Sequence, residues 1–535
     1  MKLNYFFTIT ILACLNGFSQ NKQTVLFSID NAPFYTQEFL ENYNKNATLI
    51  SDAENSLESY LDLFINYKLK VKEAKDLKLD TFPSYITELN EYRTRLIQPF
   101  LKDKNITEKL VSEAYERLQK EINASHILLF LKPSAAPKDT LAAYSKLIEA
   151  RKLIQNGTSF SEVAKQFSED PSVQQNGGNL GFFTAMQMVY PFENAAYSTT
   201  VNSVSKPFRT QFGYHILQVH EMRPAHGEVE VAHIMIPTND SNSSKSKIDS
   251  VHNLLLNNKE RFSELAAKFS KDKATASKGG RLNKFSYGQM VEAFSKVAFD
   301  LKNVDDISMP FKTEYGWHIV KLLKKYPLEN FEAIKANLTQ KVERDNRSNL
   351  IGQSVINRLL KSYTIVVNNE VLNEFKTKDW RTLTDSNAVL LTINDKEIKQ
   401  FEFIKYLESV KHQDVSSAFN KFKEQEVLDY YKETIEFSNK EFAATYNEFK
   451  EGLLLFDLLE QKVWEKSKDS IALSSYFNTF KNTKYKEKEL EIIKGTVISD
   501  YQNYLENLWI ESLHKKYKVK INKSEKKRLI KLNKK

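Results

Sequence analysis

One stretch of this sequence, Ala124–Val219, occurs a second time further along the chain. The first copy opens with ASHILLF and closes with PFRTQFGYHILQV, and the second opens with VAHIMIP and closes with PFKTEYGWHIVKL. Matching residues recur at separations of 102 to 107 positions. Self-similarity at a fixed spacing indicates two tandem copies of one domain, so the central part of the chain must fold as a small structure built twice.

The repeated positions include every type of side chain that could form a site. Each copy keeps two histidines, one aspartate and one threonine, together with a leucine, a methionine and a phenylalanine. In the first copy these are His126, Asp170, Thr210, His215, Leu180, Met188 and Phe192. In the second copy they are His233, Asp272, Thr313, His318, Leu282, Met290 and Phe294.

The order of these motifs resembles the parvulin family of peptidyl-prolyl cis-trans isomerases. The shared signature is a strand with Ser/Ala-His-Ile, then FS-x-D, Gly-Gly-x-Leu, Met-Val-x-x-Phe or its variant, and a closing strand Gly-x-His-Ile. The resemblance implies an α+β fold in each copy, with the order β-α-α-β-α-β-β and a small antiparallel sheet wrapped by helices. It covers roughly two hundred of the 535 residues, and its motifs recur in the same order twice.

The family comparison also implies a site. A proline ring would lie among Leu180, Met188 and Phe192, or among Leu282, Met290 and Phe294. The two histidines of each copy would lie on adjacent central strands, hydrogen-bonded to each other. Asp170 with Thr210, and Asp272 with Thr313, would fix the histidine tautomers and polarise the bound amide. We assign the histidines mainly a tuning role and the apolar pocket and the aspartate the larger catalytic share.

Simpler interpretations compete with this site. A methionine and an aromatic residue four positions apart on a helix usually belong to an ordinary core, and a buried histidine pair can simply hold a sheet together. The second copy also has Asn283 where the first has Gly181, which predicts a reshaped loop. Either copy could therefore serve only as a peptide-binding platform, and the motifs favour the first copy as the active one.

Other chemistries fit the sequence poorly. Neither a cysteine nor a His-x-x-x-His pattern accompanies the histidines, which disfavours zinc. Ser125 neighbours His126 on a strand and points to the opposite face, which argues against a hydrolase. Lys132 and Lys138 are too few for phosphate-directed recognition. Twisting an X-Pro bond requires no metal and no cofactor, so we expect neither.

The net charge of +9, from 77 basic and 68 acidic residues, does not indicate a nucleic-acid-binding protein. Part of the excess lies in the C-terminal stretch SEKKRLIKLNKK, which is best interpreted as a solvated tail. Helix-turn-helix, zinc-finger and phosphate-binding glycine motifs are missing from the sequence. We expect no nucleic-acid partner.

The N-terminus has the pattern of a secretory signal peptide. Lys2 precedes an apolar run and then small residues, which predicts cleavage after Ser19. The one cysteine, Cys14, lies in a sequence that loosely resembles a lipoprotein cleavage box, so a lipid anchor is the secondary interpretation. The expected location is the periplasm.

The flanking regions read as helical and contain a quieter duplication. VLFSIDNAPFYTQEFLENY at Val25–Tyr43 matches VLLTINDKEIKQFEFIKYL at Val389–Leu407 with an offset of 364. LLKSYTIVVN, ending at Asn368, matches SLHKKYKVKIN, ending at Asn522, with an offset of 154. We interpret Val25–Ile122 and Leu328–Phe375 as one split helical module with both copies inserted, followed by a related, uninterrupted module. This arrangement resembles SurA- and PrsA-type periplasmic folding factors.

The predicted domains follow from these boundaries. They are a signal peptide at 1–19, a helical chaperone segment at 20–122, parvulin domains at 123–223 and 227–326, a helical segment at 327–378 that completes the first module, and a C-terminal helical chaperone-like module at 385–535.

Two functions remain open from sequence. The first is a periplasmic isomerase and folding chaperone whose partners are unfolded or partly folded exported and outer-membrane proteins with X-Pro bonds. The second is a holdase chaperone, or an accessory protein of the outer-membrane assembly machinery, whose parvulin domains mainly bind peptide.

Overall fold

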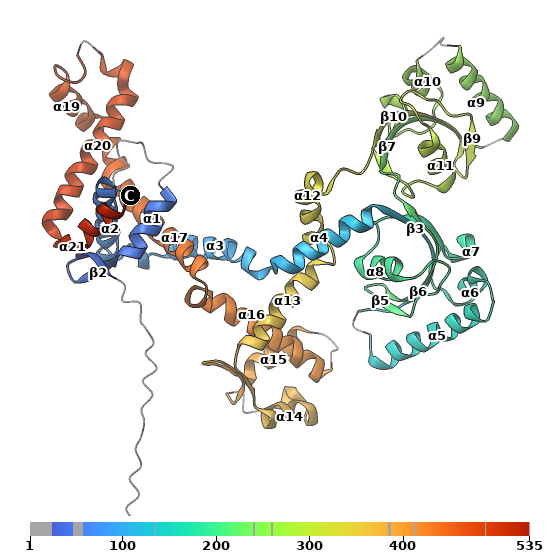
Figure 1. Cartoon of the computed structure of the whole chain (residues 1–535), viewed down its shortest axis with the longest axis horizontal. Helices are drawn as coiled ribbons and strands as arrows, with labels where there is room; N and C mark the ends of the chain where they lie inside the picture. The colour runs from blue at the N-terminus through green and yellow to red at the C-terminus, as the bar shows by residue number, and fades with distance from the viewer. Residues whose placement is uncertain are drawn as a thin grey trace, which may run out of the picture. The chain divides into compact units, whose positions relative to one another are not determined.

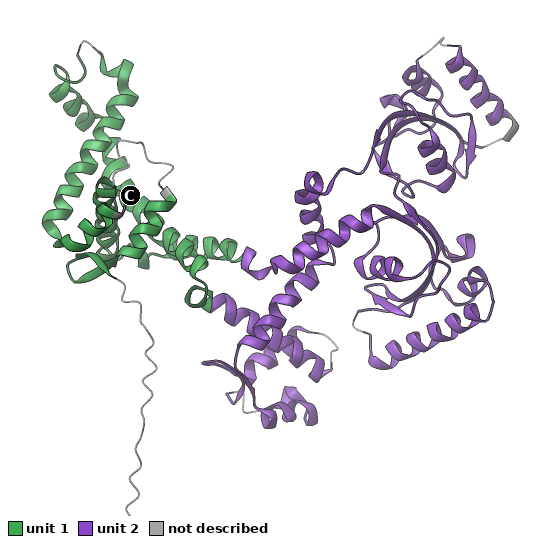
Figure 2. Ribbon diagram, viewed as in Figure 1, with its two compact units in different colours: residues 1–98, 434–535 green, residues 99–433 purple. Residues whose placement is uncertain are grey.

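A computed structural model gives the fold of most of the chain. It describes residues 24–46, 57–133, 135–238, 241–257, 261–383, 387–410, 414–486 and 488–533. The predicted signal peptide and Cys14 lie outside these residues. No helix in the described part of the chain is both long and apolar enough to cross a membrane. The chain divides into two compact units, residues 1–98 with 434–535 and residues 99–433 (Figure 2).

The first copy forms a four-stranded antiparallel sheet in the order β4-β3-β6-β5 (Figure 1). Its strands are β3 (Lys120–Phe130), β4 (Asn179–Phe183), β5 (Phe208–Thr210) and β6 (Gly213–Pro224). Its helices are α5 (Pro137–Gln155), α6 (Phe160–Phe167), α7 (Val173–Asn176) and α8 (Tyr190–Ser198). The sheet is buried on both faces. Ile127, Leu129 and Ile216 pack towards α5 and α6, whereas Ala124 and Leu217 pack towards α8.

The second copy repeats this sheet in the order β8-β7-β10-β9. Its elements are β7 (Glu228–Ile236), α9 (Ser241–Leu256), α10 (Phe262–Phe269), β8 (Phe285–Ser286), α11 (Glu292–Asp300), β9 (Phe311–Thr313) and β10 (Gly316–Tyr326). His126 faces Leu217 in the first sheet, and His233 faces Val320 in the second. These pairs occupy equivalent positions, so the two central strand pairs share one register.

The glycine pair of each copy is required by a close backbone contact. The amide of His126 donates to the carbonyl of Gly178 at 2.9 Å, and a Cβ on Gly178 would lie 2.5 Å from the carbonyl oxygen of His126. Gly280 has the same relationship to His233, with 2.3 Å to its carbonyl oxygen. Both glycines have positive φ, 84° and 79°. Any other residue would push the motif off the strand that carries the first histidine.

Helices from both sides of the two copies pack together in residues 99–433. They are α4 (Lys104–Leu118), α12 (Phe331–Arg344) and α13 (Ser348–Ser362). Leu110 and Ala114 of α4 share a buried core with Leu338 and Val342 of α12 and Ile351 of α13. The polypeptide therefore leaves this helical core through α4, forms both copies, and returns through α12.

Two small sheets carry the second duplication. One has the order β14-β1-β2, from β14 (Val519–Ile521), β1 (Val25–Ile29) and β2 (Ala32–Tyr35); the other has the order β11-β12-β13, from β11 (Ile365–Val367), β12 (Val389–Ile393) and β13 (Lys396–Lys399). Ser28 faces Lys520 in the first sheet, and Thr392 faces Val366 in the second. The offset of 364 takes Ser28 to Thr392, and the offset of 154 takes Val366 to Lys520. The two residue pairs are therefore equivalent, and the two sheets are copies with the same register.

This pairing corrects the predicted modules. We expected residues 25–122 and 328–375 to form one split module, and residues 385–535 to form a module by themselves. Instead β1 pairs with β14 and β12 pairs with β11, and the boundary between units falls at residue 433. The local strand pairs are equivalent, so they cannot select the partner.

The helices that follow the first hairpin make the selection. Leu61, Phe64 and Leu69 of α2 (Leu57–Asp76) share one core with Leu458 of α17 (Lys440–Leu459) and Leu513 of α20 (Leu490–Lys516). The indole Nε1 of Trp509 donates to the carboxylate of Glu73 at 2.6 Å within this core. The buried apolar area therefore brings residues 434–533 to the N-terminal segment.

The remaining helices complete the two units. In residues 1–98 and 434–535 they are α1 (Thr36–Asn46), α3 (Pro83–Leu96), α18 (Glu465–Ser467), α19 (Ser470–Phe480) and α21 (Lys523–Asn533), and in residues 99–433 they are α14 (Asn369–Thr377) and α15 (Gln400–Ser409). Helix α16 (Val415–Ser438) runs across the boundary.

Candidate active site

The two histidines of the first copy lie side by side on the central strands of the sheet. His126 comes from β3 and His215 from β6, and their ring centroids are 5.7 Å apart with an interplanar angle of 23°. Phe192 of α8 lies edge-on to both rings, with centroids at 5.7 and 5.6 Å. Phe208 of β5 stacks on His215 at 5.4 Å. The sequence brings these residues together because alternate positions on adjacent strands point to the same face.

Each histidine has a separate hydrogen-bond partner. His126 Nε2 lies 3.1 Å from Asp170 Oδ2, and His215 Nε2 lies 2.8 Å from Thr210 Oγ1. Asp170 also accepts bonds from the amide and hydroxyl of Ser172, at 2.8 and 2.7 Å. An ionised carboxylate only accepts, so Nε2 of His126 carries the proton and its Nδ1 is left with a lone pair.

The predicted hydrogen bond between the two imidazoles is wrong. Among the described residues, Nδ1 of His126 and Nδ1 of His215 have no hydrogen-bond partner, and the rings stack instead. The two strands hold the histidines face to face across the sheet, which leaves their Nδ1 atoms without a direct bond. Asp170 and Thr210 therefore act on different rings.

The second copy reproduces this geometry. His233 and His318 stack with centroids 5.8 Å apart and 17° between planes, and Phe294 is edge-on to both. His233 Nε2 lies 2.8 Å from Asp272 Oδ2, and His318 Nε2 lies 2.8 Å from Thr313 Oγ1. All eight predicted polar residues are thus found in two matching clusters.

Two hydroxyl groups in these clusters were missed by the sequence analysis. Ser172 binds Asp170 in the first copy, whereas Thr275 donates to Asp272 at 2.5 Å in the second and also lies 3.2 Å from His233 Nε2. The offset of 102 pairs Ser172 with Ala274 rather than with Thr275. Because the hydroxyl moves by one position between the copies, comparing them does not reveal it.

Burial keeps His126, His215 and His318 neutral. It lowers the pKa of His126, although the nearby Asp170 carboxylate partly opposes the shift. Burial also lowers the pKa of His215 to about 3 and that of His318 to about 4, each assisted by the neighbouring histidine. At neutral pH these imidazoles are therefore uncharged dipoles.

The aspartates remain ionised beside them. Burial by itself would raise the pKa of Asp170 and Asp272, but hydrogen bonds outweigh it and lower both. The bonds come from Ser172 and His126 in the first copy and from Thr275 and His233 in the second.

The predicted apolar residues cover the imidazole pair. Phe192 and Phe294 are buried and form the floor, each 4% exposed. Leu180 and Met188 pack against the first floor and remain half-buried, as Leu282 and Met290 do in the second copy. Each site therefore combines a buried phenylalanine and two half-buried apolar side chains with an imidazole pair and one carboxylate.

The loop beside Leu282 differs as the glycine substitution predicts. Gly181 has a φ of 69°, and Asn283 does not share this positive value. Strand β4 has five residues, whereas β8 has two. Leu180 therefore lies within β4, whereas Leu282 lies before β8 begins.

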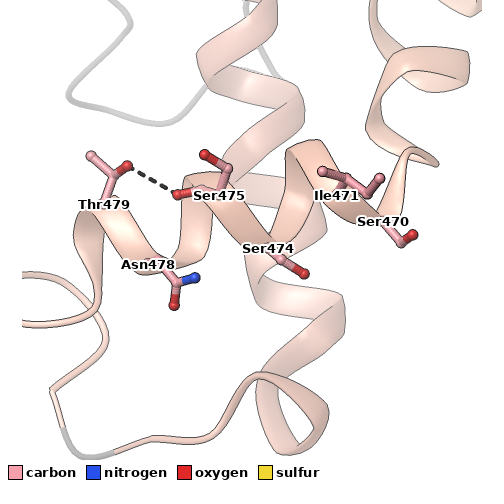
Figure 3. Close-up of a pocket in the computed structure, with 6 residues that line it drawn as sticks. All are labelled: Ser470, Ile471, Ser474, Ser475, Asn478 and Thr479. Carbon is pink, nitrogen blue, oxygen red and sulfur yellow. Dashed lines mark hydrogen bonds between the residues drawn. The ribbon is translucent and has the colours of Figure 1, made fainter.

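Other parts of the described chain offer less chemistry. They contain no group of three or more His, Cys, Asp or Glu side chains that could hold a metal ion. Figure 3 shows a shallow hollow along α19, lined by Ser470, Ile471, Ser474, Ser475, Asn478 and Thr479. Since none of these side chains titrates near neutral pH, the hollow does not compete with the two histidine clusters as a catalytic site.

Sequence profiles identify both copies. One profile of the PPIC-type PPIase domain matches residues 233–324, and a second profile with the same description matches residues 109–223. The chain carries two PPIC-type PPIase domains. We call the first copy PPIase domain 1 and the second PPIase domain 2.

Bacterial chaperones and a bacterial foldase are similar in sequence to part of this chain. Chaperone SurA of Saccharophagus degradans is 28% identical over 288 residues, which cover 49% of this chain and 64% of the relative. Chaperone SurA of Nitrosococcus oceani is 26% identical over 265 residues, 48% of this chain and 59% of the relative. Foldase protein PrsA 1 of Bacillus cereus is 40% identical over 131 residues, 24% of this chain and 41% of the relative. The chain thus spans less than two thirds of the length of these relatives.

A solved structure is also similar in part. The crystal structure of the peptidylprolyl isomerase PrsA from Bacillus anthracis is 29% identical, covers 24% of this chain and 59% of its own, and gives a TM-score of 0.18.

Proposed function

We propose that this protein is a peptidyl-prolyl cis-trans isomerase and folding chaperone. The observation that carries the proposal is the duplicated site, in which an apolar Leu-Met-Phe cluster adjoins a stacked histidine pair and an ionised aspartate. Its occurrence in two PPIC-type PPIase domains supports an X-Pro peptide bond as the substrate.

The site suits this reaction physically. Amide resonance gives the peptide bond a rotational barrier of about 18–20 kcal/mol. The twisted bond has lost conjugation and its carbonyl is less dipolar than in either planar isomer. An apolar, water-poor surface therefore penalises the planar states more than the twisted state. The reaction breaks no covalent bond, so no nucleophile is needed.

Different residues would bind the proline ring and orient the imidazoles. In PPIase domain 1, Leu180, Met188 and Phe192 would hold the proline ring, and Asp170 would orient His126. Thr210 would orient His215 on the neighbouring strand. In PPIase domain 2 the same roles fall to the ring-binding set Leu282, Met290 and Phe294 and to the polar set His233, Asp272, Thr313 and His318.

A protease-coupled isomerisation assay tests the assignment. We expect Asp170→Ala and Asp272→Ala each to remove one domain's share of kcat/KM and the double variant to lose at least tenfold. Asp139→Ala, which removes an exposed aspartate on α5, is the control. Undiminished turnover in a double variant that remains folded by circular dichroism would refute the catalytic assignment.

We infer a second activity, holding unfolded chains, from the exposed apolar side chains of residues 24–98 and 434–533. A groove between α3 and α17 is lined by the apolar side chains of Tyr92, Phe449, Leu453 and Phe456, and also by the carboxylates of Glu88, Glu448 and Asp457. Phe456 is 55% exposed. The rings of Tyr92 and Phe449 stack at 4.6 Å. Such a surface can bind the apolar segments of unfolded proteins without any chemical step.

Point variants test this activity better than truncation. Removing residues 389–535 would take β14 from one sheet and the β12–β13 hairpin from the other. We expect Phe456→Ser to weaken suppression of client aggregation while leaving isomerisation unchanged. Phe437→Ser removes a ring that is 83% exposed and lies outside the groove, and serves as the control. Equal suppression by all three proteins would exclude the groove.

The proposed location is the periplasm, and the proposed clients are exported proteins, including outer-membrane proteins. The outer-membrane assembly machinery is a proposed partner. The signal-like N-terminal sequence supports this proposal. Cell fractionation, together with a pull-down of bound envelope proteins, tests it. Recovery of the full-length chain, with residues 1–19 retained, from the cytoplasm alone would contradict it.

A further inference from the structure

The helix that carries the proline-pocket residue Phe192 is tied to the helical core by a buried ionic cluster. Glu193, the next residue of α8, is 0% exposed. Its carboxylate accepts hydrogen bonds from Arg117 Nη1 at 3.0 Å, from Arg347 Nη2, and from the Met186 amide at 2.9 Å. Arg117 belongs to α4, and Arg347 lies between α12 and α13. One carboxylate thus joins the pocket helix to both sides of the helical core.

Arg347 is the largest fully buried side chain in the described part of the chain. Besides Glu193, it pairs with Asp345, and its Nη1 lies 3.4 Å from Met186 Sδ. Its guanidinium also lies over the ring of Tyr190, 4.4 Å from the centroid. Met186, Tyr190 and Glu193 flank Met188 and Phe192 in sequence. Arg347 therefore contacts the pocket segment on both sides of its proline-binding residues.

The contacts of Met186 with Glu193 and Arg347 explain a strained backbone conformation in the pocket segment. Met186 has a φ of 69°, a left-handed conformation that is costly for a residue with a Cβ. PPIase domain 2 has Gly288 at the matching position, with a φ of 87°. Methionine persists in PPIase domain 1 where its amide and its sulfur are both held, by Glu193 and Arg347 respectively.

PPIase domain 2 replaces the cluster with a local bond. Ser295 occupies the position of Glu193 and is also 0% exposed. Its hydroxyl donates to the carbonyl of Met290 at 3.0 Å, inside the same segment. The buried polar bond of the second pocket helix therefore lies within its own domain, whereas that of the first joins it to the surrounding helices.

We infer that Arg347, together with Arg117, is a positioning residue for the proline pocket of PPIase domain 1. By holding Glu193 and Met186, it sets Phe192 and Met188 against the imidazole pair. The isomerase activity of domain 1 thus depends on helix α4 and on the connection between α12 and α13, and that of domain 2 does not. This inference rests on the proposed function, which assigns the pocket to proline.

The effect of Arg347→Met should be specific to one domain. Removing the guanidinium leaves the Glu193 carboxylate buried and short of one partner, so the segment must rearrange to solvate it. Activity of domain 1 is measured in the Asp272→Ala background and that of domain 2 in the Asp170→Ala background. We expect at least a tenfold loss of kcat/KM in domain 1, mainly through a higher KM, and less than a twofold change in domain 2. Arg344→Met, which alters an exposed arginine on α12, is the matched control.

The double variant Glu193→Ser/Arg347→Met separates positioning from stability. It removes both charges and installs the residue of domain 2, so we expect its Tm to recover while its KM for domain 1 remains high. Recovery of both quantities would show a merely stabilising ion pair and overturn the inference. A loss below twofold in domain 1, or a parallel loss in both domains, would overturn it as well. Should Arg347→Met not fold, Arg117→Met carries the same expectations.

A readout without turnover keeps this inference distinct from the isomerase proposal. The chain has seven methionines, so each methyl signal can be assigned by substitution in a 13C-methyl-labelled sample. In Arg347→Met we expect the Met188 signal to shift and the Met290 signal to stay. An unmoved Met188 signal would refute the positioning role. Lack of turnover in both parent backgrounds would instead refute the proposed function.

Discussion

The imidazole rings of His126 and His215 stack at 5.7 Å, and each ring is held by a different partner, Asp170 for the first and Thr210 for the second. Because the two stacked rings have different partners, PPIase domain 1 responds to pH through both of its histidines. Neither imidazole can be protonated without placing a cation next to the other ring in a buried site. The histidines therefore affect stability as well as the polarity of the site.

We expect both PPIase domains to lose stability in acid. The folded-state pKa of His215 is about 3 and that of His318 about 4, both below the ordinary value of 6.5. A histidine with a lowered folded pKa contributes stability that is complete above pH 6.5 and is lost as pH falls from there towards the folded pKa, because the unfolded chain binds the proton first. Each such histidine can contribute up to about 1.4 kcal/mol per pH unit in that window.

Urea unfolding between pH 7 and pH 4 measures this effect. His215→Gln keeps a polar group near Thr210 but cannot titrate, so its stability should depend less steeply on pH. His318→Gln should do the same for PPIase domain 2. If the free energy of unfolding of both variants depends on pH as steeply as that of the parent protein, these histidines are not the source of the acid sensitivity.

Thr210→Val should impair PPIase domain 1 less than Asp170→Ala does. The valine removes a neutral hydrogen bond of 2.8 Å to His215 Nε2 and leaves His126 and Asp170 in place. Losing such a bond costs about 1 kcal/mol, which corresponds to a loss of about fivefold in kcat/KM if it acts on the transition state. The measurement uses the Asp272→Ala background, and Thr313→Val in the Asp170→Ala background is the matched variant. A loss for Thr210→Val that exceeds the loss for Asp170→Ala would reverse the assigned order of importance.

The two PPIase domains should prefer differently charged clients. Asp272 lies between the exposed residues Lys271 and Lys273, whereas Glu169 and Pro171 flank Asp170. A glutamate near the proline should therefore raise kcat/KM for domain 2 relative to domain 1 by a few-fold at low salt, with the difference fading as salt screens it.

Reciprocal substitutions check the charge preference. Lys271→Glu should weaken the preference of domain 2 for acidic peptides, and Glu169→Lys should create one in domain 1. Peptide series with Glu, Gln or Lys before the proline, assayed in the single-active backgrounds, measure both changes. Identical series for the two domains would show that these side chains do not reach the substrate.

Crosslinking should report the strand pairing directly. Ser28 and Lys520 face each other on neighbouring antiparallel strands. A disulfide can bridge the Cα separation of such a pair. In a Cys14→Ser background, Ser28→Cys/Lys520→Cys should crosslink on mild oxidation, and Val366→Cys/Thr392→Cys should do so in the other sheet. Ser28→Cys/Val366→Cys should not. A crosslink between positions 28 and 366 would instead support the split module expected from sequence order.

The repeated motif order around His126, Asp170 and Phe192, through its resemblance to the parvulin family, was enough to predict the α+β fold of each copy and the membership of its polar cluster. Periodicity and motif order are local properties, and β-strand alternation then places both histidines on one face.

Tertiary structure alone decided three other features. The β1–β2 hairpin accepts β14 rather than β11 because α2 buries its apolar face against α17 and α20, while the strands themselves are equivalent in either pairing. The stacking of His126 on His215 follows from the strand geometry and not from the residue types. The ionic contact of Glu193 with Arg347 joins residues 154 positions apart, and no repeated motif marks it. The strength of this contact comes from the exclusion of water, and the core that excludes water forms only when the chain has folded.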